Sequence, residues 1–180
     1  HEYETVVIDS ASTLESLVWA ETCRRNGAPT IEKVLSGYSK GYTEALYEWT
    51  QITDGLDALR NDRNITSILI GHVKVKAFND PTADSYDQYQ WDINGKASGM
   101  LLKWADSTLF AQRKAIVKKE KVGGFDAEKR RATSTSGPVL RTQETAAHPG
   151  GGRGVDGRRP YELELSWPAF QSAVAELANA

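Results

Sequence analysis

Asp9 is the first residue whose type and position could do chemistry. The apolar stretch TVVI at residues 5–8 precedes it, and small hydroxyl residues follow, beginning with Ser10. An apolar run without alternation suits a strand buried on both faces, and ligands bind beyond the carboxyl ends of such strands. A carboxylate there can hold Mg²⁺, usually through water, beside nucleotide phosphates. Alternatively, Asp9, Ser10 or Ser12 caps a following helix.

A second apolar stretch, ITSILIGH at residues 65–72, ends at His72. If the two strands are parallel neighbours, Asp9 and His72 meet at the same edge of the sheet. His72 could then sense a γ-phosphate by hydrogen bonding; the alternative is a buried histidine with its hydrogen bonds satisfied. Lys74 and Lys76 alternate beyond it and so face the same side of an extended chain. Two ammonium groups there suit phosphate, either of ATP or of a nucleic-acid backbone.

The composition fits one globular domain with a core, since 39% of the 180 residues are hydrophobic and 26% are charged. The single cysteine excludes an internal disulfide framework and a cysteine-based zinc cluster. The net charge of −2 is unevenly distributed, because residues 113–159 hold 12 of the 22 Lys and Arg but only 5 of the 24 Asp and Glu. This basic segment meets nucleic acid or a nucleotide phosphate, or it is a solvated loop.

Hydrophobic periodicity predicts an α/β domain with a partly parallel sheet. The expected strands are 5–8, 65–72, 107–119, 138–144 and 161–167, and the expected helices are 10–25, 41–62, 94–106 and 168–180. Residues 77–92, 123–137 and 148–160 are expected to be loops, the second of them a hairpin tip or a mobile loop. The apolar sides of the first two helices are predicted to contain Leu14, Leu17, Val18 and Trp19, and Leu46, Trp49, Ile52, Leu56 and Leu59.

Three segments in this order carry a resemblance: TVVIDSAS, ILIGHVKVK and NGKASGMLLKWADSTLFAQRK. They resemble the second half of a RecA-like ATPase core. More closely, GYSKGYTEALYEW, IGHVKVKAFNDP and LLKWADSTLFAQRK resemble phage nucleotide-binding proteins of the RecA-like, single-strand-annealing and recombination class. The resemblance covers roughly residues 3–170. It implies a RecA-like P-loop NTPase core with a mostly parallel sheet flanked by helices, then a C-terminal β-hairpin or edge strand and a helix.

The resemblance also implies one partial domain. Residues 1–122 would be the core from the Walker-B strand onward, 123–160 a basic Gly-rich hairpin or loop, and 161–180 the closing strand and helix. The chain contains no G-x-x-x-x-G-K-[ST] phosphate-binding loop. We therefore expect a portion truncated before the Walker-B strand, so that the full-length protein hydrolyses ATP and this chain alone does not.

The family pattern assigns roles to individual residues. Asp9 would bind Mg²⁺ through water, Ser10, Lys74 and Lys76 would contact ATP, and His72 would sense the γ-phosphate. The loop 77–92 would match a mobile DNA-binding loop whose aromatic residues stack on bases, unless the loop packs them on the body of the domain. Those candidate DNA-binding residues are Phe78, Tyr86, Tyr89 and Trp91.

Near the end of the chain, the family carries a Lys-Asn-Arg motif whose basic residues reach a neighbouring subunit's nucleotide. The matching stretch DGRRPYELE lacks the Lys and Asn, so either Arg158 or Arg159 would be this trans finger, or both are solvated. The implied partners are single-stranded DNA and further copies of the chain, in a ring or filament in the cytoplasm of a bacterial host, with no membrane. Alternatives are a non-catalytic DNA-binding or assembly domain with a RecA-like remnant, and an ATPase related to replicative helicases.

Overall fold

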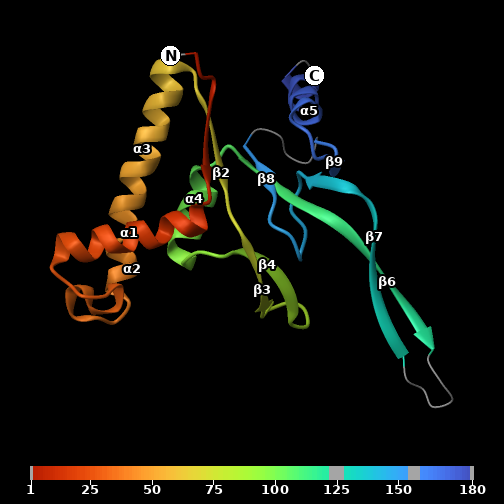
Figure 1. Ribbon diagram of the computed structural model, residues 1–180, viewed down its shortest axis with the longest axis horizontal. Helices are drawn as coiled ribbons and strands as arrows, with labels where there is room; N and C mark the ends of the chain where they lie inside the picture. The colour runs from red at the N-terminus through yellow and green to blue at the C-terminus, as the bar shows by residue number, and fades with distance from the viewer. Residues whose placement is uncertain (1, 122–127, 154–158, 179–180) are drawn as a thin grey trace. The chain divides into compact units, whose positions relative to one another are not determined.

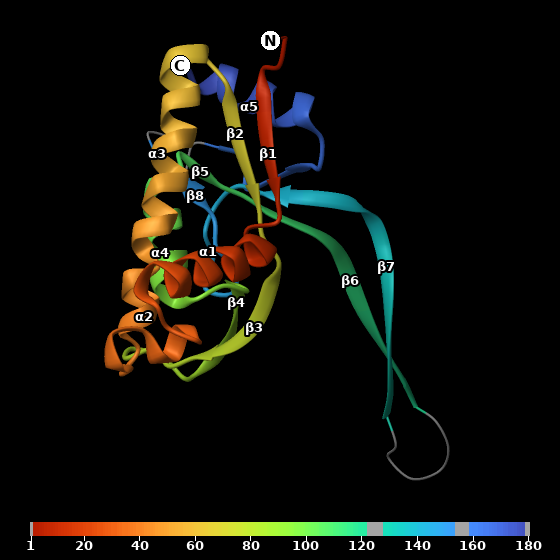
Figure 2. The same ribbon diagram turned by 60° about the vertical axis from the view of Figure 1, so that its left-hand side comes forward.

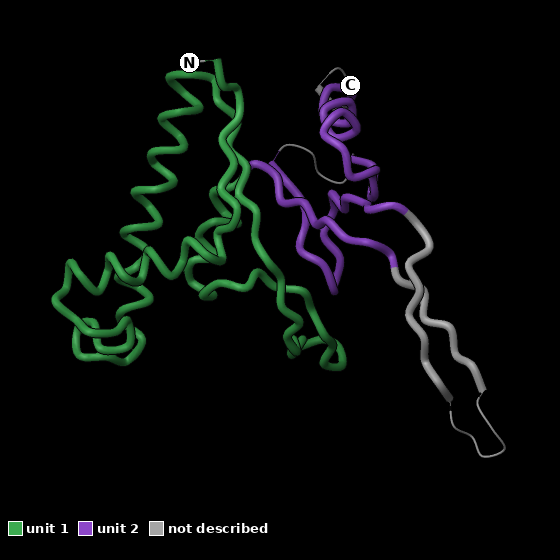
Figure 3. The backbone as a smooth tube through the Cα atoms, in the orientation of Figure 1, with its two compact units in different colours: residues 1–105 green, residues 106–180 purple. Residues whose placement is uncertain are grey.

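The computed structural model describes residues 2–121, 128–153 and 159–178. The chain divides into two compact units, His1–Ala105 and Asp106–Ala180 (Figure 3). The predicted single domain, with segments 1–122, 123–160 and 161–180, stays a prediction.

The first unit combines helices with two small sheets (Figure 1). A helical region separates the two strands of the parallel pair in sequence, and the antiparallel pair follows directly after the second of them. In chain order the elements are β1 (Thr5–Asp9), α1 (Ala11–Asn26), the 3₁₀ segment η1 (Ile31–Ser36), α2 (Lys40–Glu44), α3 (Leu46–Arg63), β2 (Thr66–Ile70), β3 (Val73–Phe78), β4 (Tyr86–Trp91) and α4 (Gly95–Trp104).

The parallel sheet consists of β1 and β2, in register from Thr5 opposite Thr66 to Asp9 opposite Ile70. This confirms that the two apolar runs are parallel neighbours, although β2 ends two residues before His72. Sequence-distant strands can pair in this way because the intervening helices return the chain to the same end of the sheet.

The prediction of a loop at residues 77–92 is wrong. β3 and β4 form an antiparallel hairpin, in register from Val73 opposite Trp91 to Phe78 opposite Tyr86, and residues 79–85 connect them. In the hairpin, the backbone N–H and C=O groups of the two strands bond to each other, whereas in a loop they would bond to water. The Asp- and Pro-containing sequence gives no signal of this pairing.

The core of the first unit lies among the helices. Trp49 is 0% exposed, and Val34, Val18 and Leu101 are buried with it. Further side chains from α1, α3 and β2 pack against this cluster, among them Leu14, Trp19, Leu46, Ile52 and Leu69. Helix α4 is tied to α3 by the Trp104 Nε1 donor, which lies 3.1 Å from the Asp57 Oδ2 acceptor.

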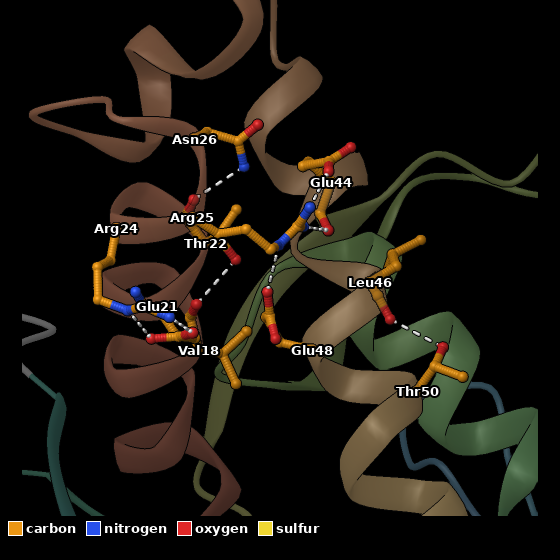
Figure 4. Close-up of polar contacts among 10 residues, drawn as sticks. All are labelled: Val18, Glu21, Thr22, Arg24, Arg25, Asn26, Glu44, Leu46, Glu48 and Thr50. Atoms are coloured by element: carbon orange, nitrogen blue, oxygen red, sulfur yellow. Dashed lines mark hydrogen bonds and ion pairs between the residues drawn. The ribbon is translucent and has the colours of Figure 1, made fainter.

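Arg25 joins α1 to the two helices that follow it (Figure 4). Its Nε donates to Oε1 of Glu48 at 2.8 Å, and its Nη1 lies 2.7 Å from Oε1 of Glu44. The guanidinium also lies 4.7 Å from the centre of the Tyr47 ring. One side chain therefore fixes the end of α1 against both α2 and the start of α3.

The connection from η1 to α2 has an unusual backbone. Residues 35–39 all have positive φ, and only Gly37 among them is glycine. Such angles cost an L-residue free energy, so surrounding packing must hold the segment. Val34 on one side is fully buried, and Gly41 on the other lets α2 approach η1 closely, while Tyr38 at the tip is 94% exposed.

The second unit is built on antiparallel strands. β6 (Phe110–Lys121) and β7 (Glu128–Arg141) form a long two-stranded ribbon, seen from a second direction in Figure 2. β9 (Glu162–Glu164) pairs with the end of β7, and β5 (Ser107–Thr108) pairs with β8 (Gly151–Gly152). Helix α5 (Trp167–Ala178) follows.

Parallel pairing in the described part of the chain is therefore confined to β1 and β2, where a mostly parallel sheet was expected. The fold is a mixed α/β structure with a small parallel sheet. No helix within the described ranges is long and apolar enough to cross a membrane.

Candidate functional site

Asp9 lies at the carboxyl end of β1, where the chain turns into α1 through a cis peptide bond to Ser10. Ser10 is the residue that caps α1, since its Oγ accepts a hydrogen bond from the Thr13 backbone N–H at 3.3 Å. Capping therefore does not use the Asp9 carboxylate, which is exposed and has no side-chain partner among the described residues. Ser10 itself is buried, and its hydroxyl also lies 3.3 Å from that of Thr13.

His72 lies at the same end of the sheet. Asp9 is opposite Ile70 in the β1–β2 register, and His72 follows Ile70 by two residues. Its backbone N–H donates to the Ser12 Oγ in α1 at 3.1 Å, which joins the segment after β2 to the turn after β1. The histidine is exposed rather than a buried, satisfied residue, so its ring is open to a ligand at this edge.

Lys74 and Lys76 both lie on β3, on one face of the hairpin. Lys74 Nζ is 3.1 Å from Oδ1 of Asp92 and 3.4 Å from the Ile93 carbonyl oxygen, so its charge is already engaged. Lys76 is exposed and makes no ion pair with any described residue. Of the two ammonium groups, Lys76 is the one more readily offered to a phosphate.

The register of the hairpin separates the four aromatic candidates into two pairs. Residues opposite each other share a face and the faces alternate along each strand, so Phe78 and Tyr86 lie on the face of the lysines. Their ring centres are 5.5 Å apart. Tyr89 and Trp91 lie on the opposite face, where Trp91 packs against Gly71 and the core.

The acidic residues of this region are largely kept from the lysine face. Asp87 belongs to the other face by register, and Asp92 is paired with Lys74. Asp80 accepts hydrogen bonds from the backbone and hydroxyl of Thr82 within the turn, and these bonds lower the pKa of Asp80. The lysine face thus presents Lys76 and two aromatic rings beside amide side chains at Gln88 and Gln90.

Arg159 is the one member of the predicted arginine pair that can be placed, because Arg158 lies outside the described residues. It is 5% exposed in the second unit, where Nη2 donates to Ser107 Oγ at 2.8 Å and the guanidinium lies 5.6 Å from the Phe170 ring centre. Its Nε and Nη1 are buried and have no hydrogen-bond partner among the residues that the structure describes. Burial lowers the pKa of this guanidinium. Its role across a subunit interface stays a prediction.

The side chains around Asp9 suit a magnesium ion that is shared with nucleotide phosphates. Within the described ranges, no group of three or more His, Cys, Asp or Glu side chains could enclose a metal ion. Magnesium is commonly held by one or two carboxylates together with waters and substrate phosphates, so one exposed carboxylate is a sufficient protein ligand if phosphates complete the site. Asp9 therefore fits a shared magnesium–nucleotide site and does not fit an all-protein metal cage.

Sequence reasoning did not find Glu15, although it contacts this region. The side chain is only 6% exposed, and its Oε1 accepts a hydrogen bond from the Asn94 backbone N–H at 2.7 Å. Burial raises the pKa of Glu15, while the bond from Asn94 and the charge of Lys74 oppose that rise. A lone glutamate in an amphipathic helix gives no sequence signal of such a partner.

The model of the AAA domain family matches residues 1–154. The chain belongs to this family. Membership assigns it to the nucleotide-binding, ATPase-type class, whose members use a nucleotide and usually Mg²⁺. A search of curated proteins and a search of solved structures find no match. The edge with Asp9 and His72 lies within the matched residues, as does the β3–β4 hairpin.

Proposed function

We propose that this AAA domain provides the magnesium and γ-phosphate side of a RecA-like ATP site, in a phage-type protein that acts on single-stranded DNA in recombination or annealing. The observation that supports this most is the shared edge of β1 and β2, where an exposed Asp9 carboxylate and an exposed His72 follow paired parallel strands. Ligands of α/β sheets bind at such edges.

Each residue has a separate task in this site. Magnesium would neutralise charge on the β- and γ-phosphates. Asp9 would hold the ion through water, and the His72 ring would supply a hydrogen-bond donor for the γ-phosphate. Lys74 keeps its bond to Asp92, and Lys76, farther along β3, is assigned to the DNA contact described below. Since the 180 residues include no phosphate-binding loop, the backbone donors that cradle the phosphates must come from another segment, and these residues alone should not hydrolyse ATP.

The test is magnesium-dependent ATP binding by the protein as its gene encodes it. Asp9→Asn should weaken Mg²⁺–ATP binding at least about tenfold, because a neutral amide interacts less strongly with a hydrated cation. Asp54→Asn is the matched control, since Asp54 is an exposed aspartate on α3. Equal affinities of Asp9→Asn and the wild type in titration calorimetry would remove Asp9 from the site.

We further propose that the lysine face of the β3–β4 hairpin binds single-stranded DNA. Lys76 supplies charge for the backbone, and Phe78 and Tyr86 supply rings on which bases stack. Trp91 has a packing role instead, because it faces the core. This assigns DNA contact to one face of the hairpin rather than to all four aromatic residues.

Fluorescence anisotropy with an oligo-dT strand tests this assignment. Tyr86→Ala should weaken binding by about 1–3 kcal/mol for each base that loses its stacking partner. Lys76→Ala should reduce the slope of log affinity against log salt by about 0.7 for one lost phosphate contact. The control variants are Tyr38→Ala and Lys33→Ala, both exposed outside the hairpin. If control and hairpin variants bind alike, the hairpin is not the DNA site.

A non-catalytic DNA-binding or assembly domain is the second candidate, and the missing phosphate-binding loop is the observation that favours it. DNA binding by the gene-encoded protein that is indifferent to Mg²⁺–ATP would support this candidate. ATP-driven unwinding instead of annealing would indicate a relative of replicative helicases.

Assembly into a ring or filament in the bacterial cytoplasm is part of the leading proposal. Because Arg159 is enclosed by β5, β8 and α5, a contact with a neighbour's nucleotide would require that packing to open. Mass photometry with and without Mg²⁺–ATP and single-stranded DNA tests the assembly. A monomer under all conditions would contradict it.

A further inference from the structure

The two ends of the β3–β4 hairpin are bonded to the same helix. At the start of the hairpin, the His72 N–H donates to Ser12 Oγ at 3.1 Å. Just after its end, the Asn94 N–H donates to Glu15 Oε1 at 2.7 Å. Ser12 and Glu15 are three residues apart and so lie on one side of α1. Helix α1 therefore accepts one hydrogen bond from each end of the hairpin.

Additional bonds join the two ends of the hairpin to each other. The Asp92 N–H donates to the His72 carbonyl oxygen at 2.8 Å, directly across the base. Lys74 on β3 contacts both Asp92 and the carbonyl of Ile93 on the returning chain. The base of the hairpin is thus a closed unit, and its attachment to α1 positions the whole hairpin.

The same helix starts at the proposed magnesium ligand. Ser10 caps α1 immediately after Asp9, and β1 and α1 meet at this turn, near the point where β2 passes into β3 (Figures 1 and 2). Ser12 and Glu15 lie in the first turns of the helix, two and five residues beyond the cap. A small displacement of the turn would therefore move the two acceptors that hold the hairpin.

Burying the carboxylate of Glu15 costs free energy that an apolar side chain at this position would not. A carboxylate that is 6% exposed loses most of its hydration, and one backbone N–H with a nearby Lys74 only partly replaces it. An apolar residue would pack there without this cost but would leave the Asn94 N–H without an acceptor. The carboxylate is explained if its task is to hold that N–H, which begins the cap of α4 at Asn94.

We propose that Ser12 and Glu15 are positioning residues that couple the nucleotide edge to the hairpin, so that occupancy of the Asp9 site changes the affinity of the hairpin for single-stranded DNA. This inference rests on the proposed function. It adds a route between the two sites: Asp9, the first turns of α1, the two acceptors, and the two ends of the hairpin. Coupling between sites is reciprocal, so bound DNA must raise the affinity for ATP by the same factor by which ATP raises the affinity for DNA.

The attachment itself is tested without any ligand, by amide hydrogen exchange in the gene-encoded protein. Glu15→Ala should speed exchange of the Asn94 N–H about tenfold, and Ser12→Ala should do the same for the His72 N–H, because each loses its acceptor. Glu15→Gln keeps an acceptor oxygen and should retain protection at Asn94. Unchanged exchange in both alanine variants would overturn the attachment.

Two residues of the same helix serve as controls. Among the described residues, Ser16 Oγ bonds within α1 alone, to the Thr13 carbonyl, and the Glu21 side chain pairs with Arg24. Ser16→Ala and Glu21→Ala should leave exchange of the hairpin amides as in the wild type. If these controls loosen the hairpin as much as Ser12→Ala and Glu15→Ala do, general destabilisation of α1 is the cause and the assignment is wrong.

The coupling is tested by measuring oligo-dT affinity with and without Mg²⁺–ATP. The ratio of oligo-dT affinity with Mg²⁺–ATP to that without it should be the same in the wild type and both controls. In Ser12→Ala and Glu15→Ala this ratio should fall close to one. A purely structural role would weaken binding equally in both conditions and keep the ratio, which would overturn the coupling. A wild-type ratio of one would contradict the proposed ATP dependence and the coupling with it, whereas hydrogen exchange would still decide the attachment.

Discussion

Replacing Gly41 with alanine should destabilise the first unit, although alanine is the better helix former. An added Cβ would lie 1.9 Å from the Ile31 carbonyl oxygen, 3.0 Å from the Ile31 carbonyl carbon and 3.1 Å from Val34 Cβ. Two of these atoms belong to backbone that cannot rotate away. α2 and η1 must therefore separate by roughly 1.5 Å to reach an ordinary contact of about 3.4 Å, and the buried Val34 would lose packing as they do so.

The two opposing effects differ in size. Glycine to alanine inside a helix gains about 0.5–1 kcal/mol from reduced backbone entropy. Overpacking a well-packed interior costs about 1–3 kcal/mol, and more when backbone must move. Gly41→Ala should therefore lower the free energy of unfolding by about 2 kcal/mol. Gly55→Ala on α3 is the matched control, since an added Cβ meets nothing within 4 Å, and it should raise stability by about 0.5–1 kcal/mol.

Urea unfolding followed by tryptophan fluorescence measures both variants, because Trp49 is 0% exposed in the folded state. Transition midpoints should move in opposite directions with unchanged slopes. A Gly41→Ala variant as stable as the wild type, or two variants that shift in the same direction, would refute the close approach of α2 to η1.

Three further predictions concern single side chains. Arg25→Gln should lower the free energy of unfolding by at most about 1 kcal/mol through loss of its partly exposed ion pairs, while Arg24→Gln should have no measurable effect in the same urea assay. Arg159→Met should match the stability of the wild type to within about 1 kcal/mol, because it removes two buried donors that have no partner among the described residues. Arg159→Ala should lose about 2 kcal/mol to a cavity, and a higher melting temperature for Arg159→Ala than for Arg159→Met would contradict this. Burial, with a contribution from Arg141, lowers the pKa of His148 below its ordinary 6.5, so the folded state binds fewer protons than the unfolded one and stability falls as the pH drops through that value; His148→Gln should lose less stability between about pH 7.5 and about pH 5.5, and an identical pH profile would contradict the assignment.

The parallel pairing of β1 and β2 could be predicted because each strand carries its own signal, but the expectation that both strands are buried on two faces is wrong, since Val7 is 51% and Ile70 is 41% exposed. Both strands are apolar without alternation, and each precedes a polar residue. The start and end of α1 are equally readable, since Ser10 caps it and Gly27 ends it in the left-handed conformation that glycine adopts easily. Such features need no knowledge of distant residues.

The side of α1 that faces the core could not be predicted as well. Leu17 was expected on the apolar side but is 64% exposed, whereas Glu15 is buried. Glu15 can be buried because its carboxylate accepts a hydrogen bond from the Asn94 N–H, which is distant in sequence. Hydrophobic periodicity predicts the buried side of a helix from its apolar residues alone and takes no account of a distant hydrogen-bond donor.

The β3–β4 hairpin was missed for a related reason. Its second strand, YDQYQW, is polar enough to read as a loop, and the connection at residues 79–85 contains Asp and Pro. What makes it a strand is pairing with the apolar and basic first strand, in register over six residues. Strand preference depends strongly on the neighbouring strand, which sequence alone does not identify.

Because of that register, the effect of an insertion in a strand of the hairpin depends on whether its length is odd or even. Inserting one residue in β3 before Lys74 would exchange the faces of the strand beyond it, turning Lys74, Lys76 and Phe78 to the face that carries Tyr89 and Trp91, while two residues would restore the original arrangement. The connection at residues 79–85 is free of this constraint, because it lies beyond the last paired residues. Natural variation in hairpin length should therefore be unrestricted at the tip and occur in even steps along the strands.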